Sequence, residues 1–282
     1  MSYGPNPWQQ AHWDWRAAGN FICGGAGSGL LVFSVLSGVS GLAGQLLVLA
    51  GLALVGLGLF SVWLEIGRPL RAANVFFNLR MSWMSREALA SVFVFGFGLG
   101  MAAGVRSWAA PLAIAAFAFL YCQSRIVQAA RGIPAWREPL TVPLLISTGL
   151  AEGAGLFWLL GAWQVAPSAG ASGAFALLVL VRWVLWRAWR ERIGQAGIAS
   201  RALAHLDRLA FAMQWIGGAL ALALAVLAAT GVMSEAASQA LLAAAGLCVA
   251  VTGARFKFTL ITRAAFNQGF VLARLPVRGV PR

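Results

Sequence analysis

Long stretches without a charged residue limit most strongly what this chain can fold into. The longest of them, Ala17–Leu64, contains no Asp, Glu, Lys or Arg. Further stretches of this kind are Ala88–Val105, Ser107–Ser124, Pro139–Ala151, Gly153–Val181, Leu209–Ser234 and Ala236–Ala254. A helix needs about 20 residues to cross roughly 30 Å of hydrocarbon, and most of these stretches reach or approach that length. Only 10% of the residues are charged, so the sequence predicts a polytopic membrane protein.

Turn signals divide the two longest stretches. Ala17–Leu64 has room for two helices joined near Ser40, and the segment 167–173 (Pro-Ser-Ala-Gly-Ala-Ser-Gly) is typical of a turn between two more. We expect an all-α membrane protein over 1–282 with eight transmembrane helices in two packed four-helix bundles, and a partner-docking tail over 257–282. The helices are predicted near 17–40, 43–64, 87–105, 108–127, 141–163, 171–190, 207–230 and 236–256.

The basic residues divide unevenly between the two sides of this plan. An even number of helices puts both termini on one side, which then holds all of the 21 basic residues except Arg106. Short loops rich in Lys and Arg stay in the cytoplasm, so we expect both termini there and the chain in a bacterial inner membrane. The alternative is that these charges serve a docked subunit. Because apolar spans separate the charges, we expect membrane lipid and no nucleic acid as partners.

Residues able to hold a metal or a redox centre are few and scattered. Cys23, Cys122 and Cys248 belong to no CxxC or comparable ligand set, so they cannot hold an iron–sulfur cluster or zinc by themselves. His12 and His205 lie outside the predicted helices, where they cannot serve as axial ligands of a membrane haem. We therefore expect no haem and no iron–sulfur cluster in the chain itself. In any redox function, the electrons would come from a partner and leave on a diffusible carrier.

One carboxylate lies near the middle of a predicted helix. Glu152 falls within helix 141–163, where an ionisable group costs several kcal/mol unless it is paired or hydrated. Arg182 lies at a similar depth in helix 171–190, within roughly 5 Å along the helix axis. One interpretation is a buried Glu152–Arg182 ion pair. The other makes Glu152 the carboxylate of a proton relay or of a quinone pocket.

Small residues and tryptophans have structural interpretations. The run 24–29 (Gly-Gly-Ala-Gly-Ser-Gly) allows another backbone to approach closely, so we interpret it as a helix-packing surface. Many of the 13 tryptophans lie near predicted helix ends, which is typical of an interfacial belt. These are Trp8, Trp13, Trp15, Trp83, Trp108, Trp136, Trp163 and Trp189.

Three stretches on the basic side carry a resemblance to a known family. They are 13–15 (Trp-Asp-Trp), 65–71 (Glu-Ile-Gly-Arg-Pro-Leu-Arg) and 78–87 (Asn-Leu-Arg-Met-Ser-Trp-Met-Ser-Arg-Glu). Together they resemble the NrfD/DmsC/polysulfide-reductase family of membrane anchor subunits, and the resemblance extends over most of the chain. It implies a subunit that anchors a ferredoxin-like iron–sulfur protein and, through it, a molybdopterin catalytic subunit. It also implies a menaquinone or ubiquinone site at the membrane face nearest to the partner's clusters.

The candidate quinone-binding residues lie at or near the basic side on different helices. They are His12, Trp15, Asn20, Glu65, Arg68, Arg86, Glu87 and Tyr121. The resemblance places Asn20, Glu87 and Tyr121 towards the quinone. Glu65 stands where family members often have His, although a carboxylate can also exchange a proton with a quinone oxygen. The other interpretation of Glu87 is an acid that complements the helix dipole in a first turn.

The end of the chain refines the expected function. The segment 255–279 resembles the tail of the membrane subunit of phenylacetyl-CoA:acceptor oxidoreductase, a branch of this family. An acyl-CoA substrate is cytoplasmic, which agrees with the predicted orientation, and the tail would lie along an acidic surface of the iron–sulfur subunit. Three alternatives stay open. The chain could be the anchor of a dimethyl sulfoxide, polysulfide or tetrathionate reductase that oxidises quinol. It could instead be a proton-coupled transporter or proton channel that uses Glu152 and Arg182, or a purely structural anchor.

Overall fold

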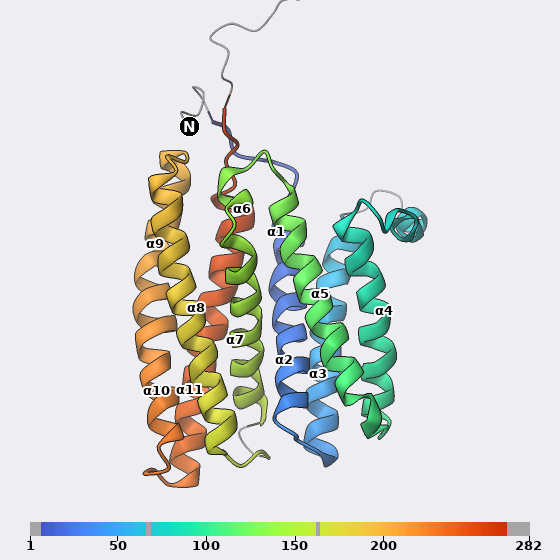
Figure 1. The fold of residues 1–282 in the computed structure, drawn as a ribbon, viewed down its shortest axis with the longest axis vertical. Helices are drawn as coiled ribbons and strands as arrows, with labels where there is room; N and C mark the ends of the chain where they lie inside the picture. The colour runs from blue at the N-terminus through green and yellow to red at the C-terminus, as the bar shows by residue number, and fades with distance from the viewer. Residues whose placement is uncertain (1–6, 66–68, 162–163, 270–282) are drawn as a thin grey trace, which may run out of the picture.

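The helices of this chain are long and run side by side along one axis (Figure 1). The computed structural model describes residues 7–65, 69–161 and 164–269. Strand structure within these ranges is limited to one isolated bridge between Gln9 and Phe266. The expected all-α fold class is therefore confirmed.

The first half of the chain forms helices joined by short connections. Gly38 and Gly41 adopt positive φ angles of 66° and 69°, which produces the hairpin expected near Ser40. The first three elements form one continuous helix. The elements are α1 (Trp15–Gly19), the π-helical η1 (Asn20–Gly24), α2 (Gly25–Leu36), α3 (Gly41–Trp63), the 3-10 helix η2 (Pro69–Asn78), α4 (Trp83–Ala102), the 3-10 helix η3 (Arg106–Trp108) and α5 (Ala109–Ala129).

The second half begins with a short helix and continues with long ones. The side chain of Ser168 caps α8 by accepting from the backbone N–H of Ala171 at 3.2 Å, within the predicted turn 167–173. The elements are α6 (Pro134–Arg137), α7 (Thr141–Gly161), α8 (Ala169–Gln195), α9 (Ser200–Phe211), the π-helical η4 (Ala212–Leu220), α10 (Ala221–Ala229), α11 (Glu235–Phe258) and the π-helical η5 (Thr259–Arg263).

Seven of the described helical segments are long and apolar enough to cross a membrane. They are Trp15–Leu36, Gly41–Trp63, Arg106–Ala129, Thr141–Gly161, Ala169–Gln195, Ser200–Ala229 and Glu235–Arg263. α4 is not among them, because Arg86 and Glu87 near its start lower its mean hydropathy. The helices thus have the length and composition of a multi-pass membrane protein, and the eighth span stays a prediction.

The helices leave most of the charge at one end. The connections at the upper end in Figure 1 carry basic residues such as Arg80 and Arg131. At the lower end, the described connections and the first turn of α11 carry only Arg106 and Glu235. We call the upper end, where α1, α4, α7 and α9 begin, the charged end.

Three helices extend further towards the charged end than the sequence predicts. α8 reaches Gln195, the next helix begins at Ser200, and the last helix continues through η5 to Arg263. Each extension carries arginines, and a helix that leaves the hydrocarbon can carry them without cost. The predicted end of the last helix at 256 is therefore too early, because residues 257–263 are helical, and the docking role of the tail stays a prediction. Residues 270–282 lie outside the described part of the chain.

α2 and α7 lie at the centre of the arrangement. α2 contacts α3, α5 and α7, while α7 also contacts α8 and α11. α4 packs on α5 and α3 at one edge in Figure 1, and α8, α10 and α11 pack together at the other. The two-bundle division stays a prediction, but the contact between α2 and α7 joins the two halves of the chain.

Glycines allow the close approach of α2 and α7. A Cβ on Gly29 would overlap the carbonyl group of Gly149, and a Cβ on Gly153 would overlap the backbone of Gly29. A Cβ on Gly149 would lie 3.0 Å from the carbonyl oxygen of Gly25. The predicted helix-packing role of the run 24–29 is therefore confirmed.

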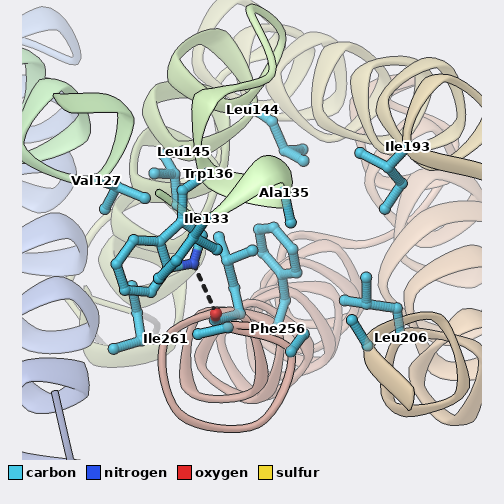
Figure 2. Close-up of a cluster of buried hydrophobic side chains, with 14 of the residues drawn as sticks. Val127, Ile133, Ala135, Trp136, Leu144, Leu145, Ile193, Leu206, Phe256 and Ile261 are labelled. Carbon is cyan, nitrogen blue, oxygen red and sulfur yellow. Dashed lines mark hydrogen bonds between the residues drawn. The ribbon is translucent and has the colours of Figure 1, made fainter. Parts of the chain in front are cut away.

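A buried hydrophobic cluster fills the protein near the charged end (Figure 2). Trp136 of α6 inserts into it with 1% of its surface exposed, and its indole N–H donates to the carbonyl oxygen of Leu260 at 2.9 Å. Trp189 is also fully buried and donates to Oγ1 of Thr141 at 2.9 Å. The interfacial belt is the wrong prediction for these two tryptophans, because each indole N–H has its partner inside the protein.

The two ends of the described chain are tied together. The backbone N–H of Gln10 donates to the carbonyl oxygen of Ala265 at 2.9 Å. The side chain of Gln10 donates to the carbonyl oxygens of Trp13 and Ile261. These bonds fix the segment before α1, including Trp13, against the end of the last helix.

Candidate functional site

A pocket of about 200 Å³ lies at the charged end, between the first helix, α3, α4 and α5. Its wall is mostly apolar and carries three polar side chains, Asn20, Glu65 and Glu87. Asn20 belongs to η1, Glu65 follows the end of α3, and Glu87 lies near the start of α4. The lining residues are Trp13, Ala17, Asn20, Phe21, Val62, Glu65, Met84, Glu87 and Ile126. The structure thus brings three of the candidate residues together in one cavity.

Glu87 is buried in this wall and is held by two neutral amides. Nδ2 of Asn20 donates to Oε1 of Glu87 at 3.2 Å, and Nε2 of Gln123 donates to the same oxygen at 3.3 Å. Nε2 of Gln123 also donates to the main-chain oxygen of Asn20 at 2.9 Å. Among the described residues, no cation pairs with Glu87. Its partners come from other helices, so its role extends beyond complementing the dipole of α4.

Charged groups surround the pocket next to Glu65. Arg16 pairs with Asp14 at 2.9 Å and donates to the carbonyl oxygen of Leu64 at 3.0 Å. The hydrogen bonds from Arg16 hold the pKa of Asp14 below its usual value. Burial raises the pKa of Glu65, the nearby carboxylate of Asp14 raises it further, and Arg16 acts in the opposite direction. Glu65 therefore keeps its proton to a higher pH than an ordinary glutamate, which suits a residue that exchanges protons.

Two other candidate residues, His12 and Trp15, do not line the pocket. His12 is exposed, and Trp15 in the first turn of α1 has 60% of its surface exposed. Both lie in or next to the segment that carries Trp13, which does line the pocket. Arg68 lies outside the described residues.

Arg86 and Tyr121 belong to a different cluster. The guanidinium carbon of Arg86 lies 4.2 Å from the centre of the Trp83 ring, and Tyr121 meets the same ring edge-on at 5.7 Å. Arg125 also lies over this ring, at 4.8 Å. These four side chains form a cation–π group on the surface between α4 and α5, and neither Arg86 nor Tyr121 lines the pocket.

Two residues of the site were missed by the sequence analysis. Gln123 lies inside an otherwise apolar span. A polar side chain there is energetically unfavourable unless it is hydrogen-bonded, so its presence marks a candidate functional residue. The sequence prediction used only ionisable residues as such markers. Trp13 had been assigned to the interfacial belt, whereas Trp15 had been selected for the quinone. In the structure it is Trp13 that lines the pocket, where its ring stacks on Phe21 at 5.8 Å and packs on Trp136 at 4.8 Å.

A second buried carboxylate lies deeper in the molecule. Oε2 of Glu152 is 2.5 Å from Nζ of Lys257, and each residue has 1% of its surface exposed. The predicted Glu152–Arg182 ion pair is therefore wrong. Arg182 instead donates to Oγ1 of Thr252 at 2.9 Å and to the carbonyl oxygen of Val249 at 3.2 Å. Arg182 is close enough to interact electrostatically with Glu152, but the direct partner of Glu152 is Lys257.

The ion pair and the amide that holds Glu87 both lie near Gly25. A Cβ on Gly25 would lie 2.5 Å from Nζ of Lys257 and 3.3 Å from Oε1 of Gln123. Gln123 donates to Glu87 on one side of Gly25, and Lys257 donates to Glu152 on the other. The absence of a side chain on Gly25 leaves the space in which these groups approach one another.

The pocket has room for one small ring. An apolar cavity of about 150 Å³ in another protein accommodates benzene, so about 200 Å³ has room for one substituted ring. Trp13 and Phe21 provide apolar faces, and Asn20, Glu65 and Glu87 provide the few polar groups that orient a ligand in such a pocket.

Among the described residues, no group of three or more His, Cys, Asp or Glu is placed to hold a metal ion.

Comparison with known proteins assigns no family. No protein-family model matches the sequence, and no curated protein sequence matches it. A function is therefore inferred from the residues of the site and their surroundings.

Proposed function

We propose that the chain is the membrane anchor and quinone-reactive subunit of a molybdopterin oxidoreductase complex. The observation that carries this proposal is the pocket at the charged end, where Asn20, Glu65 and Glu87 meet in an apolar wall. The resemblance to the NrfD/DmsC/polysulfide-reductase family supports it, because each of the three stretches behind that resemblance contributes to the wall. The first contributes Trp13, the second Glu65, and the third Met84 and Glu87.

The residues of the pocket have distinct roles in this proposal. A quinone supplies two-electron chemistry coupled to the uptake or release of two protons. Glu65 and Glu87 hold and pass protons at their carboxylate oxygens. Asn20 and Gln123 orient the carboxylate of Glu87, and the aromatic wall excludes water from the cavity. Of the candidate set, His12, Trp15, Arg86 and Tyr121 act outside the cavity.

The partners follow from the charge distribution and the lack of an obvious redox centre in the sequence. We propose that a ferredoxin-like iron–sulfur subunit docks on the charged end and receives electrons from a molybdopterin subunit. The proposal includes eight spans in two four-helix bundles, with both termini in the cytoplasm of a bacterium. The electrons then derive from a cytoplasmic substrate such as phenylacetyl-CoA. In the quinol-oxidising alternative, the same pocket serves a dimethyl sulfoxide, polysulfide or tetrathionate reductase.

Isolation of the native complex tests the proposed partners. The affinity-tagged chain, purified in mild detergent from its own membrane, is expected to retain an iron–sulfur protein and a molybdopterin protein, identified by mass spectrometry and by metal content. Recovery of a fully active single chain would contradict the proposal.

Replacement of Glu87 tests the pocket. In the intact complex, Glu87→Gln keeps the hydrogen-bonding shape but removes the proton carrier, so quinone-linked turnover is expected to fall by roughly 10²-fold or more. Activity of the catalytic subunit with a soluble artificial electron acceptor is expected to stay unchanged. The matched control is Glu191→Gln, an exposed carboxylate near the end of α8. Equal quinone-linked turnover in both variants would contradict the role of Glu87 and would indicate that the chain is a purely structural anchor.

A second candidate function is proton conduction. The buried Glu152–Lys257 pair and nearby Arg182 favour it, because ionisable groups inside a membrane commonly mark ion pathways. The purified chain alone, reconstituted in vesicles with a pH-sensitive dye, would then dissipate a proton gradient, and Glu152→Gln would abolish the flux. Vesicles that hold their gradient as well as protein-free ones would remove this candidate.

A further inference from the structure

A second and larger pocket lies at the charged end, between η1, α9 and the continuous α11–η5 helix. Its volume is about 500 Å³, and four of its lining side chains are basic. These are His205, Arg208, Arg255 and Arg263. The pocket is separate from the proposed quinone site, since the two share no lining residue.

The arginines of this pocket have no acidic partner. The chain has 8 acidic residues, and all of them lie in the described ranges. Asp207, the acid nearest to the pocket in sequence, pairs with Arg190 of α8. Arg263 lies over the ring of Phe258, with 5.5 Å between its guanidinium carbon and the ring centre. A concave surface lined by several unneutralised positive charges attracts an anion.

The lengths of the helices place this pocket at the depth of lipid headgroups. The segments Ser200–Ala229 and Glu235–Arg263 have 30 and 29 residues. At 1.5 Å per residue each is about 45 Å long, whereas the hydrocarbon core is only about 30 Å thick. Both segments therefore project beyond the hydrocarbon. The excess of about 15 Å corresponds to about ten residues. Arg208 and Arg255 each lie eight residues from the charged end of their segment, at the boundary between the projecting part and the hydrocarbon.

An exposed apolar surface continues from the pocket along the same helices. Phe211 follows Arg208 by about one helical turn and has 68% of its surface exposed. Val251 and Leu247 precede Arg255 by one and two turns, with exposed fractions of 48% and 51%. Side chains at this spacing share one face of a helix. A ligand with a negative head in the pocket and apolar chains along this face would match both surfaces.

We propose that this pocket binds the phosphate headgroup of an anionic membrane lipid. The guanidinium groups of Arg208, Arg255 and Arg263 hold the phosphate, and the acyl chains lie along the exposed face that contains Phe211 and Val251. A soluble phosphate compound shares the headgroup chemistry but would leave that apolar face uncovered. The proposal is independent of the quinone site, because none of its residues lines that pocket.

Native mass spectrometry of the purified full-length chain tests this site. Phosphatidylglycerol is expected to bind at least tenfold more tightly than phosphatidylcholine with the same acyl chains. Arg208→Gln and Arg255→Gln are each expected to lower the affinity for phosphatidylglycerol by about fivefold, which is the effect of one basic residue near an anionic lipid surface. The matched control Arg131→Gln removes an exposed charge at the same end but outside the pocket, and should change nothing. Equal binding of both lipids, or equal effects of all three variants, would overturn the proposal.

Two further arms identify the source of the phosphate. Inorganic phosphate is expected to compete with the lipid only weakly, since it lacks acyl chains. If it binds as tightly as phosphatidylglycerol, the lipid assignment fails. The chain isolated from its own membrane is expected to carry an anionic lipid that the Arg208→Gln/Arg255→Gln variant loses. Loss of an acidic protein in place of a lipid would assign the pocket to subunit docking and overturn the proposal.

Discussion

Glu87 and Glu152 are both buried carboxylates, but their surroundings differ. Glu87 lines a cavity and accepts hydrogen bonds from two neutral amides, those of Asn20 and Gln123. Glu152 lies in the packed interior against the ammonium group of Lys257 at 2.5 Å. Glu87 therefore lines a cavity and has no cationic partner among the described residues, whereas Glu152 is paired with a buried cation.

This difference suggests that one carboxylate exchanges protons and the other stabilises the fold. A carboxylate held by neutral amides can gain or lose a proton without leaving a buried cation unpaired. A carboxylate bound to a buried ammonium group cannot, because the remaining charge would lose its partner in a medium where desolvation is costly. We therefore assign proton exchange to the pocket and assign the Glu152–Lys257 pair mainly to the joining of α7 and α11.

Removal of Lys257 should give the largest loss of stability. Lys257→Met leaves Glu152 as an uncompensated buried charge, which typically costs about 3–5 kcal/mol. The double variant Lys257→Met/Glu152→Met removes both charges and should recover most of that loss. Chemical denaturation in detergent, followed by circular dichroism, measures both.

The surface pair between Arg192 and Glu138 provides the control. The side chain of Arg192 is 57% exposed, so Arg192→Met should cost less than about 1 kcal/mol. If Lys257→Met is no more destabilising than Arg192→Met, the buried pair does not stabilise the fold.

The contact between α2 and α7 should be nearly as sensitive, because it joins the regions that contain the two carboxylates. Gly153→Ala places a methyl group against the backbone of Gly29, which cannot move aside as a side chain can. Overpacking of this kind costs about 1–3 kcal/mol. The matched control is Gly96→Ala in α4, where a Cβ meets nothing within 4 Å. Because Ala has a higher helix propensity than Gly, this substitution is expected to be neutral or stabilising. Equal thermal unfolding midpoints for the two variants would contradict the close packing.

Replacement of Gln123 should have a smaller effect on stability and a specific effect on the pocket. Gln123→Leu keeps the volume but removes the bonds to Glu87 and to the main chain of Asn20, at a cost of about 1–2 kcal/mol. Since Gln123 positions Glu87 from outside the cavity wall, quinone-linked kcat should fall several-fold while activity with a soluble acceptor is retained. Gln128→Leu, on the same helix, is the control. Equal kinetics for the two variants would remove the positioning role.

The sequence predicts most of the fold because membrane spans are set by local composition. Apolar stretches, hairpin glycines and the small residues of the run 24–29 are local signals, and the helices lie close to where these signals place them. The boundaries fail at the charged end, where helices such as the one ending at Arg263 continue beyond the apolar stretch with charged and polar residues and so lose their apolar signal. The π-helical turns at Asn20–Gly24 and Ala212–Leu220 also have no local signature.

The site is less accessible to sequence reasoning because it depends on contacts between distant segments. Asn20, Glu65 and Glu87 were predicted from the motifs that resemble the NrfD/DmsC/polysulfide-reductase family, and their side chains do meet in one pocket. The choice between Trp13 and Trp15 depends on which side of a helical turn each one occupies, which the hydrogen bonds of Gln10 to the end of the chain decide. Lys257 was missed for a related reason, since a single cation near the end of a span is expected to turn outwards.

The smallest expected effect concerns Glu65, the carboxylate at the edge of the pocket. Its pKa is raised above the ordinary value of 4.5, chiefly by burial. Between that value and the raised one, the folded chain holds more protons than the unfolded chain, so this residue's contribution to stability falls as pH rises through the interval. Asp14 has the opposite sign: its lowered pKa adds stability above its ordinary value, and this is lost as pH falls. Because Glu65 is only partly buried, water screens the effect to less than about 1 kcal/mol.

Thermal unfolding midpoints measured across this pH range separate Glu65 from other carboxylates. The wild-type chain and Glu65→Gln should unfold at similar temperatures at low pH, and the variant should become the more stable of the two as pH rises. Glu191→Gln changes an exposed carboxylate and should run parallel to the wild type throughout. In the intact complex, Glu65→Gln should also remove the part of the pH dependence of quinone-linked turnover that this carboxylate sets. If Glu65→Gln runs parallel to the wild type in both measurements, Glu65 does not exchange protons at the pocket, and Glu87 is left as the carboxylate that does.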